Sequence, residues 1–196
     1  VNELLRGFEA NGYRAAIFSD NYPERWIIRN NIFHDITGGH TSWPEGRGIN
    51  IYRNPTLVIA NNTFHNFPEE GAIAIALVAY VKDAIVFNNV ISGASSGIVA
   101  VAGATCTNDF NVFWNVDTPH SGAAAAGAHD RTADPRFKDA AGLDFRLGND
   151  ALKFSAAKVF NGVGAPDDDY FGATRGAALS FGAIDAPALG LTLLLR

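Results

Sequence analysis

WIIRNNIFHDI, residues 26–36, is repeated along the chain with the same order of apolar and polar positions. The other copies are LVIANNTFHNF (57–67), AIVFNNVISGA (84–94) and CTNDFNVFWNV (106–116). Their second asparagines are Asn31, Asn62, Asn89 and Asn111, in steps of 31, 27 and 22 residues. Because a period of about 20 to 50 residues is typical of solenoids, the repeat predicts a chain that stacks one coil on the next.

A second repeated element opens with glycine and lies between these copies. It reads GYRAAI (12–17), GINIY (48–52), GAIAI (71–75) and GIVAV (97–101). Both elements are rich in β-branched and aromatic residues, and Gly, Pro, Asn and Asp separate them. This pattern favours strands over helices, so each repeat is expected to hold two or three short strands.

Large apolar side chains occupy one register of the repeat, at Phe33, Phe64, Ile91 and Phe113. At the strand spacing of about 4.8 Å, each can lie on the next and fill a continuous core. Asparagine tolerates left-handed torsions in bends, and its amide can bond the asparagine one coil away. The chain has 17 asparagines, 15 of them at or before Asn115, and we interpret them as a turn ladder and not as catalytic residues.

On these residues the chain resembles the right-handed parallel β-helix proteins of the pectate-lyase-like superfamily, whose coils share an Ile-x-Asn-Asn-x-Phe pattern. Downstream, DPRFKD (134–139), GLDFRL (142–147), DYFGATR (169–175) and GAID (182–185) look like the closing region of secreted bacterial members. The chain departs from that pattern at DALKFS (150–155), where a Ser-Pro-Ala-Ile-Asp-like run is usual, so the end cap is expected to be locally altered. The resemblance implies an all-β right-handed parallel β-helix of about four to six coils with an irregular C-terminal closing segment, secreted or at the cell surface.

The organisation expected is one domain over residues 1–196, with the asparagine-ladder coils in 1–116 and the last coil and closing segment in 117–196. SGAAAAGAHD (121–130) reads as a mobile connection or an irregular last coil. The leucine-rich tail APALGLTLLLR (186–196) is expected to close the bottom of the solenoid or to mediate self-association through a strand edge. Because the chain lacks methionine and begins without a secretory leader pattern, we expect a processed product or a fragment of a larger enzyme.

The composition limits the kinds of partner that the chain is expected to bind. The longest apolar stretch, 73–81, is shorter than the roughly 20 residues of a membrane-spanning helix. The net charge is −5 and the 15 Lys and Arg residues are scattered, which argues against a nucleic-acid partner. A single cysteine, Cys106, excludes an internal disulfide and reads as a small buried hydrophobe.

Relatives of this fold cleave polysaccharides, usually acidic ones, and the resemblance places their sites on the outer face of the glycine-started strands and in adjoining loops. If Ile49 and Ile51 point inward, Asn50 and Tyr52 point outward. The same logic turns further side chains outward: Ala72, Ala74, Ala76, Val99 and Val101. Because two of these coils present no acid, base or ligand, the middle of the strand face is not expected to hold a conventional active site.

The loops hold more side chains suited to binding and catalysis than the strand face does. The loop GGHTSWPEGR (38–47) offers an aromatic ring and polar groups for a sugar, and the expected substrate-binding residues are His40, Trp43, Tyr52 and Tyr80. An eliminative lyase needs a base and a cation, so Lys82, Arg53 and Arg47 are the candidate catalytic residues. Glu45, Glu69 and Glu70 supply hard oxygen ligands, which makes calcium the candidate cofactor.

Other polar residues support weaker interpretations. A glycoside hydrolase needs paired carboxylates, but Asp35, Asp83 and Asp109 fall at different turns, and Asp169 reads as a cap or turn residue. His34 and His65 share one column and are interpreted as a surface ladder because no third metal ligand is evident.

Two functional hypotheses follow. The first is an extracellular carbohydrate-active protein of the polysaccharide-lyase-like class that acts on or binds acidic polysaccharide. The second is a non-catalytic carbohydrate-binding or structural module. The bare strand face favours the second, and the 38–47 loop with the cationic region around Lys82 favours the first.

Overall fold

The computed structural model describes residues 4–6, 9–10, 15–19, 25–38, 45–53, 56–101 and 103–186. Its elements in these ranges are strands, apart from one short 3-10 helix, η1 (Asp150–Leu152). No helix in the described ranges is long and apolar enough to span a membrane.

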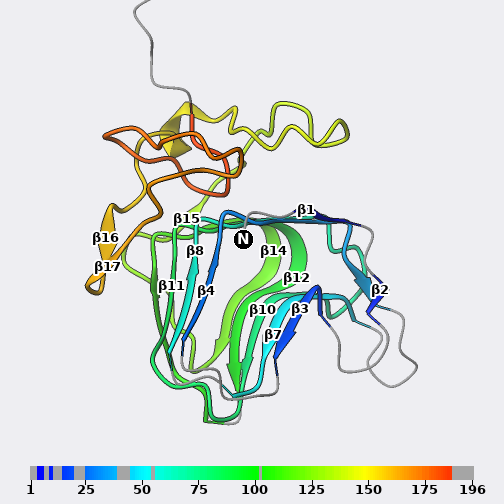
Figure 1. The fold of residues 1–196 in the computed structure, drawn as a ribbon. Helices are drawn as coiled ribbons and strands as arrows, with labels where there is room; N and C mark the ends of the chain where they lie inside the picture. Colours follow the sequence, from blue (N-terminus) through cyan, green and yellow to red (C-terminus); the bar gives the residue numbers. More distant parts are fainter. Residues whose placement is uncertain are drawn as a thin grey trace, which may run out of the picture.

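Parallel strands from successive coils form the walls of a solenoid (Figure 1). One wall contains, in spatial order, β13 (Cys106–Asp109), β11 (Ala84–Phe87), β8 (Leu57–Ala60) and β4 (Trp26–Arg29). The other two walls belong to one bent sheet, because the long strands β12 (Val90–Val101) and β14 (Val112–Gly122) run through both. The prediction of an all-β parallel β-helix is confirmed.

The remaining strands complete these walls. At its start, β12 continues the row β1 (Leu4–Arg6), β5 (Ile32–His34) and β9 (Thr63–His65). At its end, β12 pairs with β10 (Ile73–Val78), which is followed by β7 (Arg47–Ile51) and β3 (Ile17–Ser19). Five shorter strands remain. β15 (Arg131–Thr132) pairs with β14, while β2 (Glu9–Ala10) with β6 (Thr37–Gly38) and the antiparallel hairpin of β16 (Val159–Phe160) with β17 (Val163–Gly164) form two separate small sheets.

The core follows the predicted register. Phe33 pairs with Phe64, and their rings stack with centroids 4.5 Å apart and planes 5° from parallel. Ile91 and Phe113 continue the same row. These side chains are buried, so the stacked column forms the centre of the hydrophobic core.

The second asparagine of each repeat forms an internal ladder. The side-chain amides of Asn31, Asn62 and Asn89 each donate to Oδ1 of the next asparagine at 3.0 Å. Each accepting Oδ1 also receives the backbone N–H of the donating asparagine. The ladder ends at Asp130, whose Oδ1 accepts the backbone N–H of Asn111 at 2.7 Å. The predicted turn ladder is therefore present, and it lies inside the coils, fully or almost fully buried.

The first asparagine of the Asn-Asn pair in the first three repeats lies on the opposite side of the turn. Asn30, Asn61 and Asn88 adopt left-handed torsions with φ of 55°, 53° and 58°. Their side chains point away from the core and meet residues of the closing segment, 134–186. The left-handed torsion and the amide ladder, both expected of asparagine, are thus divided between two neighbouring columns.

The closing segment packs along the flank of the coils. In Figure 1 it appears in yellow to orange beside the stacked strands. Its apolar residues contact outward-facing residues of several coils, including Ile32, Val58, Val90 and Val112. Leu152 of η1 and Phe181 are buried against Val90 and Val112. Residues 134–186 therefore cover a side wall, while most of the leucine-rich tail lies outside the described residues.

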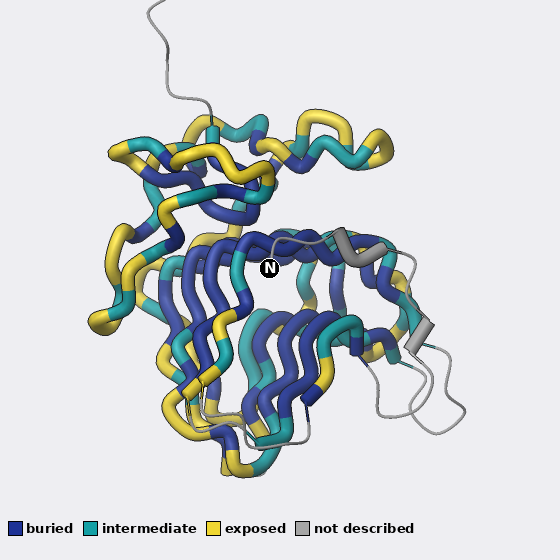
Figure 2. The backbone as a smooth tube through the Cα atoms, in the orientation of Figure 1, coloured by how far each residue is buried: buried dark blue, intermediate teal, exposed yellow. Residues whose placement is uncertain are grey.

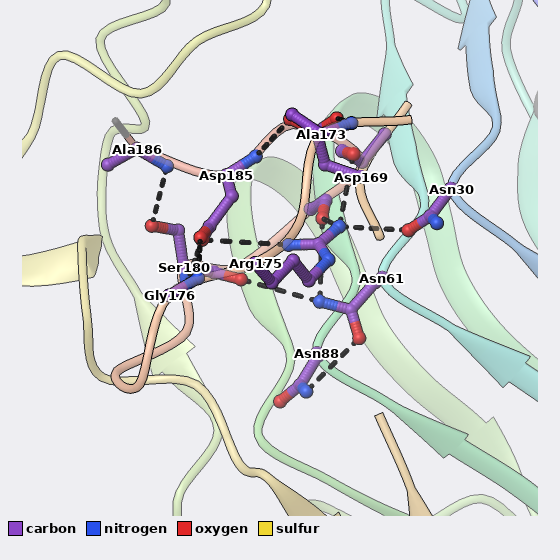
Figure 3. A network of polar contacts seen from close by, with 12 residues as sticks. Asn30, Asn61, Asn88, Asp169, Ala173, Arg175, Gly176, Ser180, Asp185 and Ala186 are labelled. Carbon is purple, nitrogen blue, oxygen red and sulfur yellow. Dashed lines mark hydrogen bonds and ion pairs between the residues drawn. The ribbon is translucent and has the colours of Figure 1, made fainter. Parts of the chain in front are cut away.

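Arg175 anchors this segment to the coils (Figure 3). Its Nη2 donates to Oδ1 of Asn30 at 2.8 Å and to the carbonyls of Gly182 and Ala183 at 3.0 Å. Burial lowers the pKa of Arg175, against the opposing effect of the nearby Asp185 carboxylate. Asp169 is a turn residue, as predicted, because its Oδ1 accepts two backbone N–H groups from its own turn.

The stacked histidines lie beneath the same segment. His34 and His65 are in register, with ring centroids 5.4 Å apart, and Phe145 meets both rings edge-on. Phe137 meets His65 in the same way. The predicted stacking of the two histidines is confirmed, but the predicted surface position is wrong, because His34 is buried and the closing segment packs on the rings.

The predicted outward orientation of Ala72 and Ala74 is wrong, because both belong to the core. Ala74 lies in a row with Gly48 and Gly97, where the chain bends and the alternation of faces is interrupted. A Cβ on Gly97 would lie 2.7 Å from Cε1 of Phe113, so only small residues fit over the stacked rings. Beyond this corner, Ala76 is in register with Asn50 and Val99 on the face away from the core.

Candidate functional site

On the outer face of β7, β10 and β12, the most exposed side chains lie at or just beyond the ends of the strands. Asn50 and Ala76 are buried in the middle of the face, with exposed fractions of 0% and 2%. At the strand ends, Val101 is 40% exposed and Tyr80 is 59% exposed. Figure 2 shows the same trend along the chain, with buried strands and exposed connections between them. On β7 and β10 a large ligand therefore has access to the strand ends and not to the middle of the face.

An unusual backbone turn presents Tyr80. β10 ends at Val78, and the next two residues, Ala79 and Tyr80, have φ of 34° and 37°. The backbone N–H of Val81 donates to the carbonyl of Ala79, which closes a tight turn. Positive φ is uncommon for residues with bulky side chains, and such torsions are concentrated at binding and active sites. The turn holds the Tyr80 ring out from the wall.

Arg53 lies against this ring. Its Cζ is 5.5 Å from the centroid of Tyr80, within the range of a cation–π interaction. The contact arises because Arg53 follows β7 and Tyr80 follows β10, and these strands are adjacent with Ile51 opposite Leu77. The structure thus brings together two of the residues selected from the sequence.

Two more aromatic residues lie nearby, one just after β7 and one on the neighbouring strand β3. The ring of Tyr52, at the end of β7, meets that of Phe18 from β3 at 6.3 Å and 63°. Phe18 is 38% exposed. We call Phe18, Tyr52, Arg53 and Tyr80 the Tyr80 cluster. It joins apolar ring surface to one guanidinium group.

Lys82 is exposed two residues after Tyr80. Its Nζ donates to the carbonyl of Gly103 in the next connection at 2.6 Å. This contact fixes the ammonium group beside the Tyr80 turn. Lys82 therefore extends the positive charge of this end of the coils.

The third candidate catalytic residue, Arg47, lies at the opposite end of β7. Five residues lie between Arg47 and Arg53, and an extended chain of this length spans at most about 20 Å. Arg47 forms an ion pair with Glu45, with Nη2 and Oε1 2.5 Å apart and both side chains mostly buried. Arg47 and Arg53 therefore do not act on the same sugar unit.

The three glutamates do not form the expected calcium site. Glu45 is engaged by Arg47, Glu70 is exposed, and Oε2 of Glu69 is buried without a hydrogen-bond partner in the described ranges. No group of three or more His, Cys, Asp and Glu residues that could hold a metal occurs in those ranges. His40 and Trp43, the remaining substrate-binding candidates, lie outside the described residues.

Two histidine–aspartate pairs in the last coil could not be predicted from the sequence. Nδ1 of His129 is 2.7 Å from Oδ2 of Asp109, and the His129 ring stacks on Phe110 at 4.3 Å. Nε2 of His120 is 3.0 Å from Oδ2 of Asp130. Burial raises the pKa of Asp130, but His120 and the backbone N–H groups of Asn111 and Gly127 outweigh it and hold that pKa below its usual value. The partners meet only because the irregular 123–130 loop folds back onto β13 and β14.

Comparison with known proteins addresses the fold. A family model described as a right handed beta helix region matches residues 6–133. No curated protein and no solved structure matches the chain. The matched range ends just after β15, where the parallel ladder also ends.

Proposed function

This chain belongs to the right-handed β-helix family, and on that premise we propose that it is an extracellular carbohydrate-active protein that binds acidic polysaccharide through the Tyr80 cluster. The observation that carries the proposal is the guanidinium of Arg53 lying against the exposed ring of Tyr80. An acidic sugar needs both groups, because it has an apolar ring face and a carboxylate.

Each residue of the cluster has a distinct part in binding. The exposed Tyr80 ring can pack against the apolar face of a sugar, and its hydroxyl remains at the water boundary. Arg53 can donate two hydrogen bonds to a carboxylate in a bidentate geometry. Its contact with Tyr80 orders the long side chain before the ligand arrives, which reduces the entropic cost of binding. Lys82 adds positive charge that attracts a polyanion.

A second candidate function is polysaccharide lyase activity. It is favoured by the presence of Arg53 and Lys82 on either side of the Tyr80 turn, which supplies a cation and an amine near one sugar unit. An elimination reaction needs a base for the proton beside the uronate carboxylate and a cation for the charge that develops. In this version Arg47 has no catalytic part, because it lies at the other end of the strand.

Affinity measurements test the proposal. Binding to polygalacturonate and to its neutral methyl ester is measured by calorimetry for the wild type, Arg53→Gln and Tyr80→Ala. We expect each variant to bind the acidic polymer about 10-fold more weakly, because one charged or stacking contact is lost. The wild type should prefer the acidic polymer to the ester.

The matched control is Arg136→Gln, which removes the same charge from an exposed position of the closing segment. It should bind like the wild type. Unchanged binding in both Arg53→Gln and Tyr80→Ala would contradict the proposal. Ultraviolet-absorbing unsaturated product, lost in Lys82→Ala, would select the lyase over the binding protein.

A further inference from the structure

A cavity of about 470 Å³ lies in the closing segment, away from the Tyr80 cluster. Its lining combines three cationic side chains with an apolar surface, from Lys138, Arg146, Leu147, Lys153 and Phe154, together with Asp150 and Ala186. Cavities of this size are typical of sites for small organic ligands. The segment is thus more than a cover for the side wall.

Two of the three cations are held in place by neighbouring carboxylates. Arg146 binds both oxygens of Asp144 through Nε and Nη2, and Nζ of Lys153 is 2.7 Å from Oδ1 of Asp150. These contacts lower the pKa of Asp144 and of Asp150, so both carboxylates stay ionised near neutral pH. The two pairs are neutral overall.

Lys138 is the third cation that lines the cavity. Its backbone N–H donates to the carbonyl of Arg146 at 3.0 Å, which fixes the two residues side by side. Its ammonium group lies close enough to Asp144 and Asp150 to contribute to the lowered pKa of both carboxylates. Three cations beside these two carboxylates give the cavity a net positive charge of about one unit.

The apolar part of the cavity is also held rigidly. Leu152 of η1 is buried against Val90 and Val112 of the coils, which anchors the residues that follow it. Phe154 has φ of 59° and is 37% exposed. A left-handed torsion is rare for phenylalanine. The Phe154 ring lines the cavity and is partly exposed, although phenylalanine rings are usually buried.

From these observations we infer that this cavity binds a small cyclic carboxylate, with its acid group at Lys138 and its ring against Phe154 and Leu147. The ordered ion pairs of Arg146 and Lys153 supply further donors at the rim. The inference does not depend on polysaccharide binding, because the cavity and the Tyr80 cluster share no residue.

Three probes separate the two parts of this recognition. The probes are 2-naphthoate, its neutral amide, and acetate, which has the charge without the ring. Calorimetry on the full chain should show binding of 2-naphthoate, with the amide and acetate each at least about 10-fold weaker. Equal binding of 2-naphthoate and its amide, or no binding of 2-naphthoate, would overturn the inference.

Variants place the binding in this cavity. Lys138→Gln should weaken 2-naphthoate binding about 10-fold without changing the melting temperature, because Lys138 is exposed. Lys158→Gln removes the same charge elsewhere in the closing segment and should leave binding unchanged. If Lys138→Gln binds 2-naphthoate as tightly as the wild type, the assignment is wrong.

Discussion

Asn88 and Asn89 are neighbours of the same residue type, yet they serve different parts of the molecule. Asn89 faces inward, where its amide bonds Asn111 and the backbone carbonyls of Ile59 and Phe87. Asn88 faces outward with a left-handed torsion, and its amide forms a reciprocal pair with the backbone of Ala157. The same division holds along both columns, so one dipeptide builds the coils and also receives the closing segment.

The difference lies in what completes the hydrogen bonds of each column. The inner column is completed by its own repeats, because each amide finds the next one 3.0 Å away. The outer column is completed only in part by its own repeats: Asn88 Nδ2 donates to Oδ1 of Asn61 at 3.2 Å, and the other polar groups of the column bond the closing segment. We therefore expect changes in the inner column to affect the whole fold, and changes in the outer column to affect the closing segment.

The largest effect is expected for Asn62→Ala. The substitution removes a side chain that donates to Asn89 and to the carbonyls of Ile28 and Ala60, and that accepts from Asn31. Buried polar groups left without partners each cost about 1 to 3 kcal/mol, so the free energy of unfolding should fall by about 4 kcal/mol. Urea denaturation measures this loss, and a loss below that of an outer-column variant would contradict the division.

A smaller and more local effect is expected for Asn88→Gly. Glycine keeps the left-handed torsion without strain but loses the two bonds to Ala157 and the bond to Asn61, at a cost of about 2 kcal/mol. Hydrogen exchange should quicken in residues 150–186 and stay nearly unchanged in the strands of 57–116. The matched variant Asn88→Ala should cost about 1 kcal/mol more, because alanine disfavours φ of 58°. Faster exchange throughout the coils would show that the outer column also holds the coils together.

The smallest effect is a pH dependence that arises at the covered histidines. Burial, and then the neighbouring His34, lower the pKa of His65 below its usual value of about 6.5, while Asp35 acts in the opposite direction. Below about pH 6.5 the unfolded chain therefore binds this proton more readily than the folded chain, and stability falls as the pH decreases. The expected loss is less than about 1 kcal/mol because His65 is partly exposed.

Melting temperatures measured across this pH range test the effect. In His65→Phe the ring can still meet Phe137 and Phe145, so docking is retained while the proton site is lost. The pH dependence should be weaker in this variant than in the wild type. An identical dependence in both proteins would assign the acid sensitivity to other groups.

Much of the fold could be predicted because the sequence pattern that specifies it is repeated in each coil. The spacing of Asn31, Asn62 and Asn89 predicted the ladder, and the column of Phe33 and Phe64 predicted the stacked core. The orientation of Ala74 could not be predicted from alternation, because the bend at Gly48 and Gly97 changes the face on which the side chains lie.

The candidate site could be predicted only in part. Arg53 and Tyr80 follow adjacent strands, so their proximity could be deduced from the alignment of coils. The ion pair of Arg47 with Glu45 depends on loop geometry. The cavity beside Lys138 depends on how an irregular segment folds, and this segment has no periodic pattern to analyse.

The proposed function is tested most directly by hydrogen exchange of the wild-type protein with and without an oligogalacturonate. We predict slower exchange in the peptides that cover residues 50–53 and 76–83, which contain the Arg53–Tyr80 contact and Lys82. Unchanged exchange in both peptides, at a ligand concentration where calorimetry shows binding, would contradict the placement of the polysaccharide site at the Tyr80 cluster.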